Sequence, residues 1–248
     1  MKNGNCVFVS SLLFLIWAGL SWGQAYPVRP VRMMIPQPPG GTMETIGRLV
    51  AEPVARALGQ NIVIDNRTGA NGIIAAETLA RATPDGYTLL YTSASLANND
   101  FVHKKLPYNF RRDFAPVTQV TTLPGYLILV GPKVPAQTLK ELIELSRTSR
   151  EPVHFGSSGV GNSQPGMPGF VYEASWHGIF APAATPAAII SRFRGEVARA
   201  VQAPKLRAIL GAGGHVVIGS TPAEFRQFLE KYFKETAEQF RIAKVAPQ

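Results

Sequence analysis

Two glycine-bearing loops carry the residue types in this chain that are best suited to chemistry. Pro39-Gly40-Gly41-Thr42 follows an apolar run at 31–36 and precedes a helical pattern. The second loop, FGSSGVGNSQ at 155–164, follows another apolar run. Glycines let backbone N–H groups approach an anion closely, and a following helix adds further donors and a favourable dipole. Either loop alone could be a tight turn, but the pair favours a cleft that holds a small anion.

The second loop is not followed by the helix that this role requires. Gln164 is succeeded by Pro165-Gly166-Met167-Pro168-Gly169, a run that cannot begin an ordinary helix. The donors of the loop are therefore present in the sequence, whereas the element expected to orient them is missing.

Catalytic and metal sites find little support. The histidines, His103, His154, His177 and His215, are scattered without an i, i+4 pair or an HExxH motif. The run GSSG at 156–159 is not a G-x-S-x-G elbow, and no Walker-type phosphate loop occurs. A hydrolase would need a nucleophile–base pair that is absent. We therefore expect a protein that is not an enzyme and that has no metal and no cofactor.

Charge and the N-terminal region indicate an exported protein. The chain of 248 residues carries a formal net charge of +9, with basic residues spread evenly and no nucleic-acid recognition motif. Lys2, the apolar run 7–22 and the small residues that end at Ala25 form the pattern of a signal peptide cleaved after Ala25. The alternative, a membrane anchor, is disfavoured because the run is short. The only cysteine, Cys6, lies inside this segment without the spacing for lipid attachment, so the mature chain has no thiol.

Hydrophobic periodicity predicts an α/β protein with a largely parallel sheet. The predicted strands are 31–36, 61–65, 86–91, 126–131, 153–156, 176–182 and 215–219. The predicted helices run from Thr42 to Gly59, from 73 to 83, from Thr138 to about Ser146, from Thr185-Pro186 to about Val201, over 205–210 and over 221–241. The last helix carries an aromatic stripe that we assign to core packing: Phe225, Phe228, Phe233 and Phe240.

Several motifs resemble a known family, the solute receptors of tripartite tricarboxylate transporters (the Bug receptors). They include YPVRPVRMMIP, PPGGTMETIGRLVAEPVARALGQNIVIDNRTGANG, ATPDGYTLL, FGSSGVGNSQ and PGMPGFVYEASWHGIFAPAATPAAIISRF, and together they cover nearly all of the mature chain. The segments NRTGANG and ATPDGYTLL are especially specific.

The resemblance implies a type II periplasmic binding protein fold, in which two α/β lobes enclose a small carboxylate ligand. It also implies a periplasmic location and partners among membrane transporter subunits or a sensor, with no role for nucleic acid. Family ligands are held largely through backbone N–H groups and water. Where the family has Gly-Thr-Asp, this chain has Thr42-Met43-Glu44. The ligand-binding residues that the resemblance implies are Pro39, Gly40, Gly41, Thr42, Thr92, Ser93, Ala94, Ser157, Ser158, Gly159, Asn162 and Ser163.

The family layout also explains the missing helix. After Gln164 this chain passes directly to the closing segment, and about 75 residues of the second lobe are absent by the size of ordinary domains. We expect 1–25 to be the signal peptide, 26–115 plus 176–248 to form a near-complete first lobe, and 116–175 to be a truncated second lobe. The predicted function is a carboxylate receptor impaired by this deletion. The alternative is a non-binding, degenerate or redeployed partner-interaction module built on the first lobe.

Overall fold

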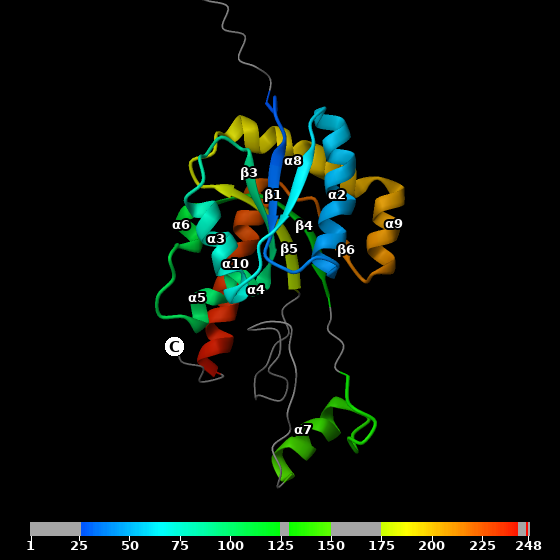
Figure 1. The fold of residues 1–248 in the computed structure, drawn as a ribbon. Helices are drawn as coiled ribbons and strands as arrows, with labels where there is room; N and C mark the ends of the chain where they lie inside the picture. The colour runs from blue at the N-terminus through cyan, green and yellow to red at the C-terminus, as the bar shows by residue number, and fades with distance from the viewer. Residues whose placement is uncertain (1–25, 125–128, 150–174, 243–246, 248) are drawn as a thin grey trace, which may run out of the picture.

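The computed structural model describes residues 26–124, 129–149, 175–242 and 247. Its centre is a six-stranded sheet in the order β2-β1-β3-β5-β4-β6, with helices on both faces (Figure 1). The strands are β1 (Val31–Ile35), β2 (Ile62–Asn66), β3 (Thr88–Ser93), β4 (Phe114–Leu123), β5 (Ser175–Pro182) and β6 (Val216–Val217).

The first three strands form the parallel part of the sheet. β1 pairs in parallel with both β2 and β3, while β5 runs antiparallel to β3, and β4 runs antiparallel to β5 and β6. The crossovers are made by α2 (Thr42–Leu58) and, after the short η1 (Ala70–Gly72), by α3 (Ile73–Ala80). This confirms the predicted strand–helix alternation and places three predicted strands, near 31–36, 61–65 and 86–91, in one sheet. The prediction of a largely parallel sheet holds only for these three strands, because β5, β4 and β6 add antiparallel pairs and make the sheet mixed.

Two hydrophobic clusters pack on opposite faces of the sheet. One joins the strands to α2, α8 (Ala187–Gln202) and α9 (Pro204–Ala212). The other joins them to α3, α4 (Ala94–Ala97), α6 (Phe110–Asp113) and α10 (Pro222–Ile242), while α5 (Asn99–Val102) follows α4. The α/β class and the return of the C-terminal segment to the sheet are therefore confirmed. Together the two clusters give the sheet a continuous core on both sides.

The aromatic stripe of α10 packs against the sheet as expected. Phe225 is fully buried, and its ring contacts Trp176 at 5.5 Å and Phe180 at 5.2 Å between centroids. A side chain at Gly178 would collide with the Phe225 ring, so this glycine permits the close approach of α10 to β5. Thr221 and Glu224 form the predicted capping box at the start of α10.

Two expectations need correction, one predicted strand lies outside the described residues, and one strand was not predicted. Residues 129–131 of the predicted strand 126–131 are not in a strand, and Leu129 is 88% exposed, while 125–128 lie outside the described residues. The predicted strand 153–156 also lies outside them. α8 begins after Pro186 without a side-chain cap, so Thr185 does not cap it. Phe114–Leu123, which we did not predict, is a central strand of the sheet that continues beyond residue 115.

The chain leaves the sheet along β4 and returns along β5. Leu123 and Ser175 pair across these two strands, so the 51 residues at 124–174 make one excursion from a single point of the sheet. Within it, α7 (Leu139–Thr148) begins with the predicted capping box of Thr138 and Glu141. α7 lies beyond the end of the sheet in Figure 1, and none of its residues is buried.

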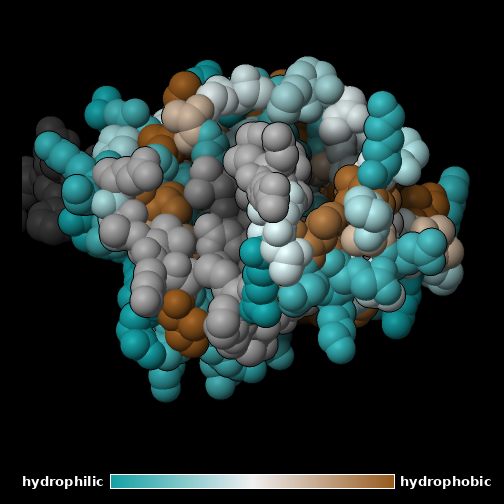
Figure 2. All heavy atoms as spheres, turned by 90° about the horizontal axis from the view of Figure 1, so that it is seen from below, coloured by the Kyte–Doolittle hydropathy of each residue, from teal (hydrophilic) through white to brown (hydrophobic). Residues whose placement is uncertain are grey.

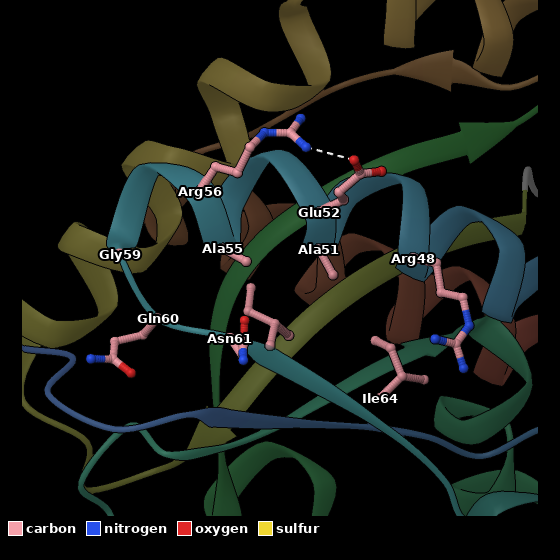
Figure 3. A pocket seen from close by; sticks show the side chains of 10 residues that line it. Arg48, Ala51, Glu52, Ala55, Arg56, Gly59, Gln60, Asn61 and Ile64 are labelled. Carbon is pink, nitrogen blue, oxygen red and sulfur yellow. Dashed lines mark hydrogen bonds and ion pairs between the residues drawn. The ribbon is translucent and has the colours of Figure 1, made fainter.

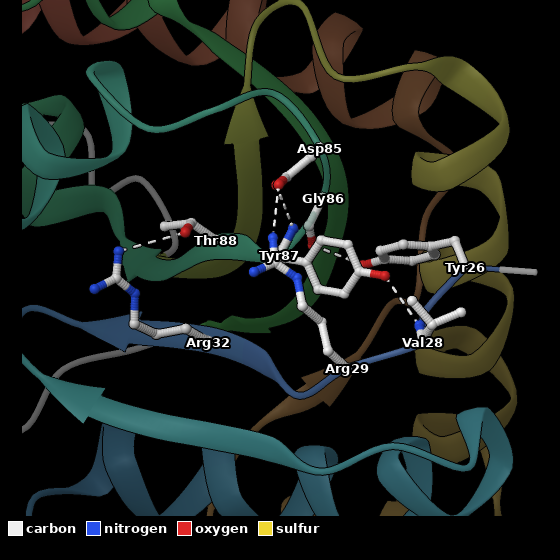
Figure 4. A network of polar contacts seen from close by, with 8 residues as sticks. All are labelled: Tyr26, Val28, Arg29, Arg32, Asp85, Gly86, Tyr87 and Thr88. Atoms are coloured by element: carbon white, nitrogen blue, oxygen red, sulfur yellow. Dashed lines mark hydrogen bonds and ion pairs between the residues drawn. The ribbon is translucent and has the colours of Figure 1, made fainter. Parts of the chain in front are cut away.

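At the end of the sheet where β1 begins, the segment that precedes β1 is bonded to the loop before β3 (Figure 4). The Tyr26 hydroxyl donates to the Gly86 carbonyl at 2.7 Å, and the Val28 N–H donates to the Tyr87 hydroxyl at 2.9 Å. Arg29 lies over the Tyr87 ring, 4.2 Å from its centroid, and pairs with Asp85 at 3.0 Å. These contacts hold the first strand against the loop before β3. None of the helices in the described ranges has the length and apolar character needed to cross a membrane.

Candidate ligand-binding site

The first predicted loop lies at the carboxyl end of β1. β1 ends at Ile35, and Gly41 is the N-cap residue of α2. Gly40 adopts a positive φ of 85°, a conformation that favours glycine. Pro39, Gly40 and Thr42 are exposed and Gly41 is half-buried, so this loop is open to solvent.

A carboxylate of the chain itself occupies this loop. The Gly40 N–H donates to Glu44 Oε2 at 2.5 Å, and Arg48 Nε donates to Glu44 Oε1 at 2.6 Å. These two bonds hold the pKa of Glu44 below its usual value. Glu44 is 6% exposed and sits at the third position of α2, where a carboxylate also favours the helix dipole. The position noted as a departure from the family pattern therefore places an anion on a predicted ligand donor.

The second predicted segment lies at the carboxyl end of β3. Thr92 and Ser93 end that strand and Ala94 begins α4, and all three residues are buried. Since β1 and β3 are parallel neighbours, with Met34 opposite Leu90, the two segments emerge at the same edge of the sheet. The Thr92 hydroxyl has no hydrogen-bond partner within the described part of the chain. The predicted first-lobe residues are thus brought to one edge.

The NRTGANG turn supports both segments. The Asn66 side chain donates to the Gln37 carbonyl at 2.9 Å, and the Asn71 side chain donates to the Ser95 carbonyl at 3.1 Å. Gly72 has a φ of 87° and approaches both Pro36 and Leu96. A side chain there would press on the loop after β1 and on α4 at once. The turn therefore sets the spacing between the two segments, although its residues were not predicted to bind ligand.

The five predicted residues of the second lobe cannot be placed beside this edge. They lie outside the described residues: Ser157, Ser158, Gly159, Asn162 and Ser163. Figure 2 shows the molecule from below, with hydrophilic side chains around the rim and hydrophobic residues in separate small patches. The two-loop cleft expected from the sequence therefore remains a prediction.

Two histidines that looked scattered in the sequence meet at the same edge. β5 and β6 flank β4, and Thr121 pairs with both His177 and Val217, which brings His215 close to His177. Their ring centroids are 5.4 Å apart with 32° between the planes. Burial, and then the neighbouring His215, lower the pKa of His177 to about 4, and burial also lowers the pKa of His215. In the sequence, each histidine comes just before or at the start of an apolar run. That pattern indicates that the two side chains meet only once β5 and β6 are known to pair with the same strand, β4.

A cavity of about 700 Å³ lies elsewhere, between α2 and the edge strand β2 (Figure 3). Ala51, Ala55 and Ile64 form part of its wall, and its lining includes none of the predicted site residues. Arg56, at its rim, is paired with Glu52 at 2.5 Å. Among the described residues, no group of three or more histidine, cysteine, aspartate or glutamate side chains could hold a metal ion.

Comparison with known proteins decides the family. The model of the tripartite tricarboxylate transporter family receptor matches residues 46–168. The chain belongs to this receptor family. A relative described as the UPF0065 protein in the tcbD-tcbE intergenic region of Pseudomonas sp. (strain P51) is 36% identical over 143 residues, which cover 56% of this chain and 41% of the relative. Protein BugT of Bordetella pertussis is 34% identical over 155 residues, covering 60% of this chain and 47% of BugT.

These matches span less than half the length of either curated relative. Comparison with solved structures extends the likeness of fold over most of the chain. Rpa4515 of R. palustris with adipate superposes with a TM-score of 0.81 at 22% identity, covering 90% of this chain and 100% of that one. MatC of Rhodopseudomonas palustris with bound malate gives a TM-score of 0.74 at 24% identity, covering 86% and 99%. The receptor family agrees with the expectation of a binding protein that is not an enzyme.

Proposed function

We propose that this chain is an exported receptor of a tripartite tricarboxylate-type transporter that binds a small carboxylate through backbone N–H groups. The observation that carries the proposal is the common edge formed by the Pro39–Thr42 and Thr92–Ala94 segments at the ends of two parallel strands. In open α/β sheets, ligands bind outside the carboxyl ends of the strands. The adipate and malate bound to its structural neighbours support a carboxylate as the ligand class.

The proposal includes a periplasmic location and a membrane partner. Residues 1–25 serve as the signal peptide, with cleavage after Ala25. The mature protein delivers its ligand to the membrane subunits of the transporter or to a sensor. The periplasmic description of its structural neighbours supports this location.

We propose further that a deletion after Gln164 has weakened ligand binding. The excursion from β4 to β5 contains 51 residues, which is near the lower limit for a cysteine-free domain with its own core. A cleft that excludes water needs walls from both lobes, and donors open to water contribute only about 1 kcal/mol each. We therefore expect dissociation constants for small dicarboxylates weaker than about 1 mM, or about 4 kcal/mol of binding.

Titration with malate, followed by amide NMR shifts, tests this function. We expect shifts at Gly40, Gly41 and Ser93 with malate but not with malamide, its neutral diamide. Saturation only above about 1 mM would support the proposed deletion, whereas micromolar binding would contradict impairment. Absence of shifts with every dicarboxylate would overturn the receptor proposal.

The second candidate is a partner-interaction module that binds no solute. The hydrogen bond from the Gly40 N–H to Glu44 favours it, since a predicted ligand donor is already satisfied within the chain. In that case no carboxylate would shift the Gly40 resonance, and the first lobe would serve a protein partner through its surface alone.

A further inference from the structure

We infer that His177 and His215 form part of the ligand-binding surface, and that they take up one proton from solvent when a carboxylate binds there. This inference rests on the proposed function. The two histidines would add side-chain donors to a site otherwise composed of backbone N–H groups. The positive charge of the protonated pair would balance the negative charge of the bound carboxylate. The proton comes from water or a buffer acid, which is left as its conjugate base in solution, and the only bond formed is the N–H bond of the imidazolium.

The position of His177 connects the pair to the predicted ligand segment. His177 is the register partner of Ser93, the last residue of β3. Directly opposed residues of antiparallel strands project their side chains to the same face, with Cβ atoms about 5 Å apart. The imidazole of His177 therefore neighbours the Thr92–Ala94 segment.

Two buried polar atoms, one in the pair and one on its neighbour Tyr91, have no partner in the described ranges. They are His215 Nδ1 and the Tyr91 hydroxyl, on residues that are 7% and 1% exposed. Among the described residues, the His177 side chain has one polar contact within hydrogen-bonding range, a long one in which Thr121 Oγ1 lies 3.4 Å from its Nδ1. The Tyr91 ring lies edge-on to His177, with 5.7 Å between centroids. Buried polar atoms are normally hydrogen-bonded, so this cluster is suited to a polar ligand.

The charged and titratable groups around the two histidines are compatible with a bound anion. From β3, Tyr91 stays neutral because burial raises its pKa, and from α2, Glu44 is paired with Arg48. α8 contributes Arg194, which donates to the carbonyls of Gly219 and Ser220.

Glu196, also on α8, is paired with Arg192 and Arg199, and α9 contributes the exposed Lys205 and Arg207. Of the titratable groups, His215 is the one that acts electrostatically on His177, and it disfavours protonation. A carboxylate at this edge would supply the missing opposite charge and favour the imidazolium form.

Proton uptake makes affinity depend on pH through linkage. We expect malate to bind the full mature chain about tenfold more tightly at pH 5.5 than at pH 7.5. NMR titration should also move the Hε1 resonances of His177 and His215 toward their protonated positions at constant pH. The His177→Gln/His215→Gln double variant reports how much of the pH effect comes from the titration of malate itself, and His103→Gln is the control for a histidine outside the cluster.

The outcomes separate the inference from the proposed function. Malate binding whose pH dependence is the same in the wild-type protein and the double variant would overturn the inference alone. No binding of malate at any pH, to a protein with native thermal unfolding, would overturn the proposed function and this inference with it. Loss of the excess pH dependence in the double variant but not in His103→Gln would support the inference.

Discussion

The sheet and the excursion between β4 and β5 differ in what covers their apolar side chains. Helices on both faces of the sheet enclose two clusters of buried residues. In contrast, α7 has an apolar side that includes Leu142 and Ile143, yet no residue of this helix is buried. Both regions begin helices with well-formed caps, since Thr138 and Thr221 each form a capping box.

This contrast separates local from long-range causes of structure. A capping box and an amphipathic sequence suffice to define where a helix begins, because they involve only neighbouring residues. Burial of the apolar side requires a partner element, and most helical stability comes from such packing. The strands have such partners in the helices on both faces of the sheet, whereas α7 has no buried residue.

Truncating a core aromatic should give the largest difference between the two regions. Phe225→Ala removes a fully buried ring between β5 and α10, and we expect a loss of about 3–5 kcal/mol in the free energy of unfolding. Leu142→Ala in α7 should cost less than about 1 kcal/mol. Urea denaturation measures both, with Phe225→Leu as a milder substitute if Phe225→Ala fails to fold. Equal losses would show that α7 belongs to a packed core.

Acidification should act on the sheet through His177. Its pKa is lowered to about 4 in the folded protein against about 6.5 when unfolded, so the unfolded state binds protons first. Stability should therefore fall as pH drops below about 6.5, with a loss of about 2 kcal/mol by pH 5. Thermal unfolding at several pH values checks this. His177→Gln should remove most of the decline, and an unchanged decline in that variant would assign it to other groups.

Glu44 allows a smaller test of the edge itself. Glu44→Ala frees the Gly40 N–H, and we expect malate affinity to increase by up to about tenfold, equivalent to one charge-assisted hydrogen bond. Glu52→Ala is the matched control, because Glu52 pairs with Arg56 at the same i, i+4 spacing on α2 but lies away from the loop. If both variants bind malate as the wild-type protein does, Glu44 does not compete for the donor.

The sequence predicted the elements whose signals are local. Gly59 ends α2 in the left-handed conformation, and the predicted strands near residues 31, 62 and 88 are all present. β4 was missed because Pro116 lies inside it, and proline argues against a central strand. The structure accommodates Pro116 at a register shift between Pro116 and Thr118, opposite β5. Such an irregularity depends on the neighbouring strand and cannot be recognised from β4 alone.

In the site, too, the sequence predicted the features with local signals and missed those that depend on the folded chain. The glycine pattern at 39–42 correctly predicted a loop between a strand and a helix, and the parallel pairing of β1 with β3 brings the first-lobe segments to one edge. The second glycine-bearing loop lies outside the described residues. Two features required the folded chain: the reach of Glu44 to the Gly40 N–H, and the meeting of His177 with His215 across β4. Both join residues whose spacing matches no binding motif, and the second joins strands far apart in the sequence.

Hydrogen–deuterium exchange tests the central claim most directly, since it compares the two regions within one molecule. The claim is that the sheet and the helices covering it carry the stability, whereas no residue of α7 is buried. We expect amides of β1, β3 and β5 to exchange only through global unfolding, and those of α7 to exchange faster by orders of magnitude through local opening. Protection of α7 equal to that of the sheet would contradict the account, because it would require a second core built from the excursion.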